Sequence, residues 1–129
     1  MKERSVAILG GRGFLGSRLV SRLESKNYAY MIGDLEETNC SAKSFKLDVE
    51  SQSSMDQIAA SSCIINLAAV HRDDVRPLSR YDDVNVQGAV NVCNVARKHG
   101  IAKIVFTSSV AIYGFSPPNT DESGEPNYF

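Results

Sequence analysis

Three glycines near the start of the chain stand at a spacing that suits phosphate binding. Gly10, Gly13 and Gly16 follow the apolar run 6–9 and overlap the start of segment 14–25, where apolar residues recur with a helical period. Gly10 permits a tight turn, Gly13 lets the backbone approach a pyrophosphate, and Gly16 lets helix and strand pack closely. The free N–H groups of the first helical turn, at Phe14 and Leu15, attract phosphate. Strand, turn and helix together predict a dinucleotide-binding site.

An acidic residue, Asp34, follows the second apolar run at about the distance from Gly10 where such folds carry a carboxylate for the ribose. We expect this carboxylate to bond both ribose hydroxyls of the adenosine and to repel a 2′-phosphate. Leu35, next to it, is also expected to contact the cofactor. The prediction is NAD rather than NADP, unless Arg12 turns onto a 2′-phosphate. A plain loop-capping role for Asp34 is the alternative.

The surrounding elements alternate between short apolar runs and longer segments of helical period, which is typical of a parallel sheet with helical crossovers. Helices are predicted at 14–25 and 84–99, a weaker one at 48–60, and a loop or single turn at 35–44. The order predicts one α/β domain, 1–129, with a Rossmann-like doubly wound parallel sheet. The expected strands are 6–9, 28–33, 45–47, 63–67 and 104–107, and their β-branched, nearly unalternating residues predict strands covered on both faces.

Composition excludes several classes of function. The formal net charge is -1, with basic residues scattered along the chain, so we expect no nucleic-acid partner. No apolar run is long enough to span a membrane and no signal peptide is recognisable, so the expected location is cytoplasmic. Cys40, Cys63 and Cys93 lack metal-binding or redox spacing and are interpreted as structural, with no metal site. His99, before Gly100, is interpreted as capping the end of its helix.

The spacing Gly10-x-x-Gly13-x-x-Gly16 resembles the extended short-chain dehydrogenase/reductase family, which contains NAD-dependent nucleotide-sugar epimerases and dehydratases. The segment 47–49 is similar to the family's adenine contact, which implies that Asp48 lies near the exocyclic amine and Val49 packs on the ring. An N-cap role for Asp48 is the alternative. The segment 66–69 resembles the family stretch on which ribose and pyrophosphate lie, and this assigns Leu67, Ala68 and Ala69 to the cofactor.

Two further segments carry the resemblance. By similarity to the family's long helix, Asn85 supports the active-site backbone and belongs to the cofactor site. Segment 106–114 resembles the family's fifth strand and catalytic segment, which implies that Thr107 contacts the cofactor and that Ser109 is the catalytic hydroxyl. Such a hydroxyl can donate a hydrogen bond to the sugar oxygen and stabilise the charge that develops there as the alcohol becomes a ketone. The alternative is that Ser108 and Ser109 only start a turn.

The family's general base, the tyrosine of a Tyr-x-x-x-Lys pair, has no counterpart in the 129 residues. Segment 121–129 resembles the loop that leads to this tyrosine. We therefore expect the catalytic pair, the last strands and the substrate domain to lie beyond residue 129, and the fragment itself to be inactive. An exposed sheet edge would then favour self-association, so a homo-oligomer is expected.

For the intact protein the resemblance implies hydride transfer between NAD and a sugar carbon of a nucleotide-diphosphate sugar. The loop 71–74 follows the fourth predicted strand, and we expect it either to contact the substrate or to be plain surface. A non-catalytic NAD(P)-binding regulatory module of the same fold is the alternative to an enzyme. The sugar, and the choice between epimerase, dehydratase and reductase, are not specified by these residues.

Overall fold

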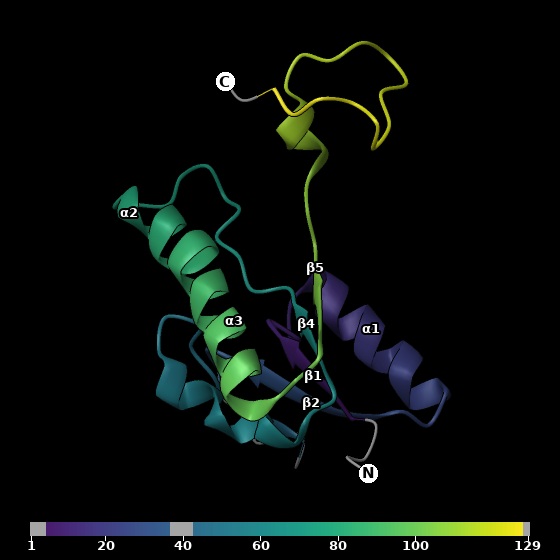
Figure 1. Ribbon diagram of the computed structural model, residues 1–129, viewed down its shortest axis with the longest axis vertical. Helices are drawn as coiled ribbons and strands as arrows, with labels where there is room; N and C mark the ends of the chain where they lie inside the picture. The colour runs from purple at the N-terminus through teal and green to yellow at the C-terminus, as the bar shows by residue number, and fades with distance from the viewer. Residues whose placement is uncertain (1–4, 37–42, 128–129) are drawn as a thin grey trace.

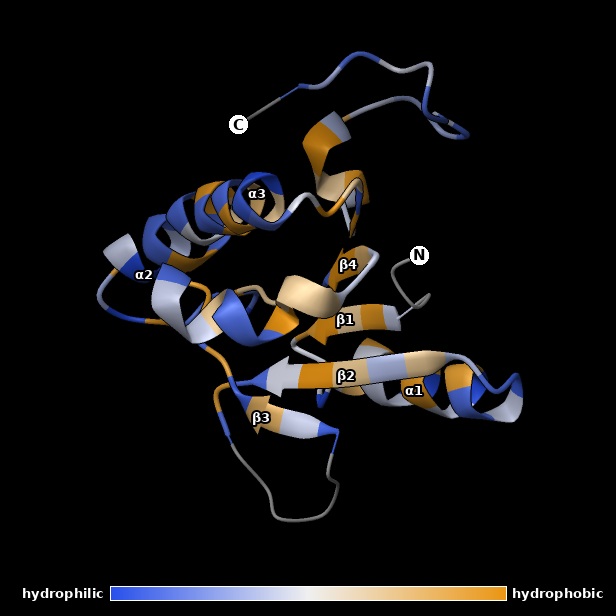
Figure 2. Cartoon of the chain, turned by 60° about the horizontal axis from the view of Figure 1, so that its bottom comes forward, coloured by the Kyte–Doolittle hydropathy of each residue, from blue (hydrophilic) through white to orange (hydrophobic). Residues whose placement is uncertain are grey.

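The computed structural model describes residues 5–36 and 43–127. It contains a five-stranded, fully parallel sheet in the order β3-β2-β1-β4-β5, which confirms the predicted α/β class (Figure 1). The strands are β1 (Ser5–Leu9), β2 (Ala29–Asp34), β3 (Ser44–Lys46), β4 (Cys63–Asn66) and β5 (Lys103–Phe106). Each differs from its predicted range by one residue, at one end or at both. Figure 2 shows β4, β1, β2 and β3 side by side.

Helices cover the two faces of the sheet. The helix α1 (Phe14–Ser25) packs on one face, and the helices η1 (Gln52–Ala60) and α3 (Gly88–His99) pack on the other. Because successive side chains of a strand point to opposite faces, Ile8 faces α1 whereas its neighbours Ala7 and Leu9 face η1 and α3. The fold therefore has three layers, as the doubly wound interpretation predicts.

Two predicted helices have a different geometry. The segment predicted as a helix over 48–60 becomes helical only at Gln52 and is a 3₁₀-helix. Its buried residues, Met55 and Ile58, are three positions apart and so share one face of a three-residue turn. The helix predicted over 84–99 already starts at α2 (Ser79–Tyr81) and continues through a π-helical stretch, η2 (Asp82–Gln87), into α3.

The end of α3 was predicted correctly in one respect. Gly100 is left-handed (φ 64°), and the N–H of Ile101 donates to the Ala96 carbonyl, as expected of a glycine stop. The His99 ring, however, lies 2.9 Å from an Asp56 carboxylate oxygen, a contact between α3 and η1 that the capping interpretation did not include. The same carboxylate accepts a bond from Lys98, and these bonds lower the pKa of Asp56.

The prediction that all strands are covered on both faces is wrong for β5. Ile104, Val105 and Phe106 are 37%, 43% and 63% exposed, because among the described residues only β4 pairs with this strand and no helix covers its outer part. After β5 the chain runs away from the sheet to the short 3₁₀-helix η3 (Val110–Tyr113) and a terminal loop (Figure 1). Among residues 5–36 and 43–127, no helix is both long and apolar enough to cross a bilayer.

Three sequence predictions lie partly or wholly outside the described residues. Cys40 belongs to the segment 37–42, as does most of the loop predicted at 35–44, and the segment 121–129 extends past residue 127. Cys63 and Cys93 are described, and both are free, half-buried thiols. Burial raises the pKa of the Cys63 thiol, which keeps it protonated at neutral pH.

Candidate functional site

A cleft of about 900 Å³ lies where the carboxyl ends of the parallel strands meet. This is the edge of an open α/β sheet at which ligands bind. Every site residue named from the sequence lines this one cleft. They are Gly10, Gly13, Phe14, Leu15, Gly16, Asp34, Leu35, Asp48, Val49, Leu67, Ala68, Ala69, Asn85, Thr107 and Ser109.

Two glycines of the turn are required by the packing of the protein itself. Gly10 has φ +75°, and a Cβ atom there would lie 2.9 Å from the backbone nitrogen of Ala68. A Cβ on Gly16 would lie 2.5 Å from the Cα of Gly11. At these two positions the backbones of neighbouring segments are in close contact: the turn meets the cleft wall after β4, residues 67–70, and α1 meets the turn. The contacts leave no room for a side chain.

Gly13 is different because the fold does not require a glycine there. Its φ and ψ of -67° and 179° suit any residue, and a Cβ would approach only the Gly10 carbonyl oxygen, at 3.4 Å. Gly13 is exposed in the cleft as the N-cap of α1, whose first turn holds no acidic residue. The first-turn N–H groups of a helix have no intrahelical acceptor. An exposed glycine beside such donors suits a phosphate that approaches the backbone closely.

The Asp34 carboxylate is held by two backbone donors. Its Oδ2 accepts from the Arg12 N–H at 3.0 Å and its Oδ1 accepts from the Leu35 N–H at 2.8 Å. Each oxygen has a second lone pair, and the residue is half-buried in the cleft wall, so the carboxylate can accept further bonds from a diol. These backbone bonds also fit the loop-capping alternative, and the two roles are compatible in one side chain.

The turn after β3 presents Asp48 and Val49. Asp48 Oδ1 accepts from the Glu50 N–H at 2.9 Å. The N-cap alternative for Asp48 is wrong, because the following helix begins at Gln52 and Ser51 is the residue before it. Val49 is buried, and its side chain lies against Gly88 of α3. An acceptor and an apolar residue therefore stand side by side in the cleft wall.

Asn85 lies in the π-helical stretch η2 and holds the wall after β4. Its Oδ1 accepts from the Val70 N–H and its Nδ2 donates to the Val70 carbonyl, both at 2.8 Å. On the same wall, the Asn66 side chain accepts from the Ala68 N–H at 3.2 Å. Two amide side chains thus satisfy the backbone of a segment that makes no ladder bonds there, which explains a polar residue in the middle of a helix.

Ser109 follows β5 and caps η3. Its Oγ accepts from the Ala111 N–H at 3.1 Å, so the turn-starting alternative describes its local geometry correctly. The hydroxyl lines the cleft and keeps its proton available for a second partner. The capping bond fixes the oxygen while leaving the O–H to donate, so the turn role does not conflict with a catalytic one.

Sequence reasoning missed a salt bridge in the cleft wall. Arg80 Nη1 and Nη2 lie 2.7 Å from Glu50 Oε1 and Oε2 respectively. The hydrogen bond from Arg80 lowers the pKa of Glu50 and raises that of Arg80 itself. No local pattern indicates this pair because its members are far apart in the chain. Other lining residues to which the sequence analysis assigned no cofactor or catalytic role are Leu47, Val70, Val84, Phe106, Ser108 and Ile112.

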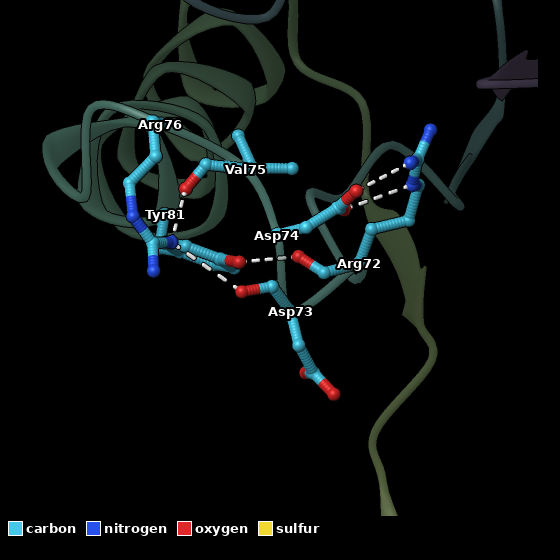
Figure 3. Close-up of polar contacts among 6 residues, drawn as sticks. All are labelled: Arg72, Asp73, Asp74, Val75, Arg76 and Tyr81. Atoms are coloured by element: carbon cyan, nitrogen blue, oxygen red, sulfur yellow. Dashed lines mark hydrogen bonds and ion pairs between the residues drawn. The ribbon is translucent and has the colours of Figure 1, made fainter.

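The loop 71–74 was expected to be either a substrate contact or plain surface. His71 lines the cleft. Arg72 forms a bidentate salt bridge with Asp74, and both of these side chains are largely exposed. The Tyr81 hydroxyl donates to the Arg72 carbonyl and ties the loop to the start of the long helix (Figure 3). Arg76 donates to the carbonyls of Asp73 and Val75. The loop is internally bonded, and of its residues 71–74 only His71 belongs to the cleft lining.

Residues 6–128 match the NAD dependent epimerase/dehydratase family. An N-acetyl-alpha-D-glucosaminyl-diphospho-ditrans,octacis-undecaprenol 4-epimerase of Escherichia coli O157:H7 is 41% identical over 123 residues, which are 92% of this chain and 36% of that protein. UDP-glucose 4-epimerase 2 of Oryza sativa subsp. japonica is 30% identical over 142 residues, with 91% of this chain and 34% of that protein covered. The chain thus spans less than half the length of these curated relatives.

Solved structures share the fold. A UDP-glucose 4-epimerase of Thermus thermophilus in complex with NAD aligns with a TM-score of 0.85 at 25% identity, over 96% of this chain and 44% of that chain. The corresponding enzyme of Brucella ovis, also in complex with NAD, aligns with a TM-score of 0.86 at 26% identity, over 98% and 42%.

Proposed function

Since this chain belongs to the NAD dependent epimerase/dehydratase family, we propose that its cleft is the NAD-binding part of a sugar 4-epimerase. NAD is the cofactor of this family, as the sequence predicted. The observation that carries the proposal is that one cleft holds both the exposed Gly13 turn with Asp34 and the Ser109 hydroxyl. If the adenosine and pyrophosphate of the cofactor lie along Asp34 and the Gly13 turn, its nicotinamide end extends toward Ser109.

Each group in the cleft then has a task. The first-turn N–H groups of α1 receive the pyrophosphate, and Asp34 accepts bonds from the adenosine ribose hydroxyls. NAD, when bound, supplies the acceptor and donor for hydride. Ser109 donates a hydrogen bond to the sugar oxygen at the carbon that loses hydrogen, and so stabilises charge that develops as the alcohol becomes a ketone.

Epimerisation leaves no net oxidation. A hydride leaves the sugar carbon while the hydroxyl proton moves to a base. Return of the hydride to the opposite face of the ketone carbon, with return of the proton to the oxygen, inverts the centre. The base must come from outside the described cleft, since no Tyr-x-x-x-Lys pair occurs among the 129 residues. We therefore assign turnover to a longer protein and expect none from this chain alone. Losing acid–base catalysis typically costs about 10²–10⁴-fold.

We propose a sugar carried on a diphosphate as the substrate class. The E. coli relative is named for a diphospho-undecaprenol sugar and the rice relative for a UDP-sugar. The shared chemistry is a hexose with a free C4 hydroxyl on a diphosphate. The carrier, a nucleotide or a polyprenol, is what differs between the two.

The test is an assay of a version of the protein that includes a Tyr-x-x-x-Lys segment. It is given UDP-N-acetylglucosamine or a short-chain polyprenyl-diphosphate N-acetylglucosamine, and the C4 epimer is measured by NMR. We expect epimer with one of the carriers and its loss in Ser109→Ala. Absence of epimer with both carriers from a folded protein that binds NAD contradicts the epimerase assignment and favours the regulatory module.

The proposed assembly is a homo-oligomer. The apolar, partly exposed strand β5 has a free edge among the described residues, and such an edge pairs readily with another chain. Sedimentation of the 129-residue chain should show association that grows with concentration, and a monomer at high concentration contradicts this.

A further inference from the structure

The salt bridge between Arg80 and Glu50 is a feature of the cleft that the proposed chemistry does not use. The two terminal guanidinium nitrogens each donate to one carboxylate oxygen at 2.7 Å, and the side chains of Arg80 and Glu50 are only 35% and 29% exposed. A parallel two-bond pair fixes orientation as well as distance. Asp83 adds a second carboxylate 3.9 Å from Arg80. The charge of Arg80 is thus neutralised by protein groups, which argues against a phosphate-binding role.

The Arg80–Glu50 salt bridge anchors the turn 48–50, which carries Asp48. The Glu50 N–H donates to Asp48 Oδ1, so the backbone of Glu50 and the carboxylate of Asp48 are directly connected. Next to them, the Val49 carbonyl accepts from the buried Asn91 Nδ2 at 2.9 Å. The long helical run 79–99 therefore holds this turn at two successive residues, Val49 through Asn91 and Glu50 through Arg80.

The same helical run holds the opposite wall through Asn85. The intervening π-helical stretch bonds with an i→i+5 pattern, as in the bond from the Gly88 N–H to the Asp83 carbonyl. Arg80 precedes this underwound stretch and Asn85 lies within it, and both line the cleft. One helix thereby sets the spacing between the Asp48 turn and the Val70 segment.

We propose that Arg80 is a positioning residue for adenine recognition: through Glu50 it holds the Asp48 carboxylate in the orientation that accepts a hydrogen bond from the exocyclic amine of adenine. This inference rests on the proposed function, in which the cleft binds NAD with its adenine beside Asp48. Arg80 itself need not touch the cofactor.

The test compares NAD with nicotinamide hypoxanthine dinucleotide, which has a carbonyl oxygen in place of the exocyclic amine. Binding to the 129-residue chain is measured by calorimetry for the unsubstituted chain and for Arg80→Ala, Arg80→Lys and Glu50→Gln. The unsubstituted chain should prefer NAD by about tenfold, the factor expected for one charge-assisted hydrogen bond. Arg80→Ala should lose most of this preference, and Arg80→Lys should retain an intermediate one.

Arg97→Ala is the matched control, because Arg97 is an exposed arginine of the same helical run that pairs with Asn94 and does not line the cleft. It should keep the full preference. If Arg80→Ala weakens both dinucleotides equally, Arg80 is merely structural and the inference is wrong. If Arg80→Ala does not fold, Arg80→Lys and Glu50→Gln decide in the same way. If the unsubstituted chain binds neither dinucleotide, the proposed function fails instead.

Discussion

Alanine at the three glycines of the turn should separate stability from cofactor binding. At Gly10, a side chain meets both the φ of +75° and a backbone nitrogen 2.9 Å away. The left-handed conformation alone costs a residue with a Cβ about 1–2 kcal/mol, and the contact adds to it. At Gly16, the neighbouring Gly11 backbone is 2.5 Å from the new atom, so turn and helix must separate. We expect both variants to unfold several degrees below the unsubstituted chain.

Gly13→Ala should behave in the opposite way. Its backbone angles are ordinary and its nearest contact is at 3.4 Å, so the free energy of unfolding should change by no more than about 0.5 kcal/mol. The added methyl group, however, stands where the pyrophosphate would approach the backbone. We expect NAD to bind at least about tenfold more weakly, which corresponds to roughly 1.4 kcal/mol.

The assay pairs thermal unfolding, followed by circular dichroism, with calorimetric titration of NAD. Gly100→Ala is the control, because Gly100 is also left-handed but lies at the end of α3, with open space around it and no place in the cleft lining. It should lose stability while keeping its NAD affinity at temperatures where it is folded. Unchanged NAD affinity in Gly13→Ala, or destabilisation as large as in Gly10→Ala, would refute the ligand-facing role of Gly13.

Three further predictions concern other contacts. Asn85→Ala leaves the Val70 N–H and carbonyl without their side-chain partners, so it should lower the free energy of unfolding by about 1–3 kcal/mol and weaken NAD binding; no effect on either contradicts the wall-holding role. The bonds from Lys98 and His99 lower the pKa of Asp56, so their contribution is present above the unfolded pKa and is lost as pH falls through the lower folded one. In urea unfolding titrations, the free energy of unfolding of Asp56→Asn should therefore fall less between neutral and acid pH than that of the unsubstituted chain. An unchanged pH profile contradicts a stabilising role for the bonds of Asp56 with Lys98 and His99. The hydrogen bond to Glu24 and burial raise the pKa of Tyr30 to about 12, so an alkaline absorbance titration should show a late phenol step that is absent from Tyr30→Phe.

Local patterns were sufficient for the glycine turn and for the positions of the five strands, because each depends on residues close in sequence. The apolar runs predicted five strands to within one residue of their bounds, and the turn, Asp34 and the later segments all line one cleft. Parallel strands explain this result: their carboxyl ends share an edge, so residues that follow different strands must come together.

Features that depend on contacts between distant segments were not predictable in the same way. The three-residue spacing of Met55 and Ile58 was a signal for a 3₁₀-helix, but a weak one at this length. The contacts of Arg80 with Glu50 and of His99 with Asp56 join segments whose approach only the packed structure defines. The exposure of β5 likewise depends on which elements cover it rather than on its own apolar sequence.

The most direct test of the central claim, that this cleft binds NAD through Asp34, is calorimetric titration of the folded chain with NAD and with NADP. The unsubstituted chain should bind NAD saturably and more tightly than NADP. Asp34→Ala should weaken NAD far more than NADP, because the carboxylate is proposed to bond the ribose hydroxyls of one and to repel the 2′-phosphate of the other. The claim is contradicted if millimolar NAD shows no saturable binding to the folded chain, or if Asp34→Ala leaves the preference between NAD and NADP unchanged.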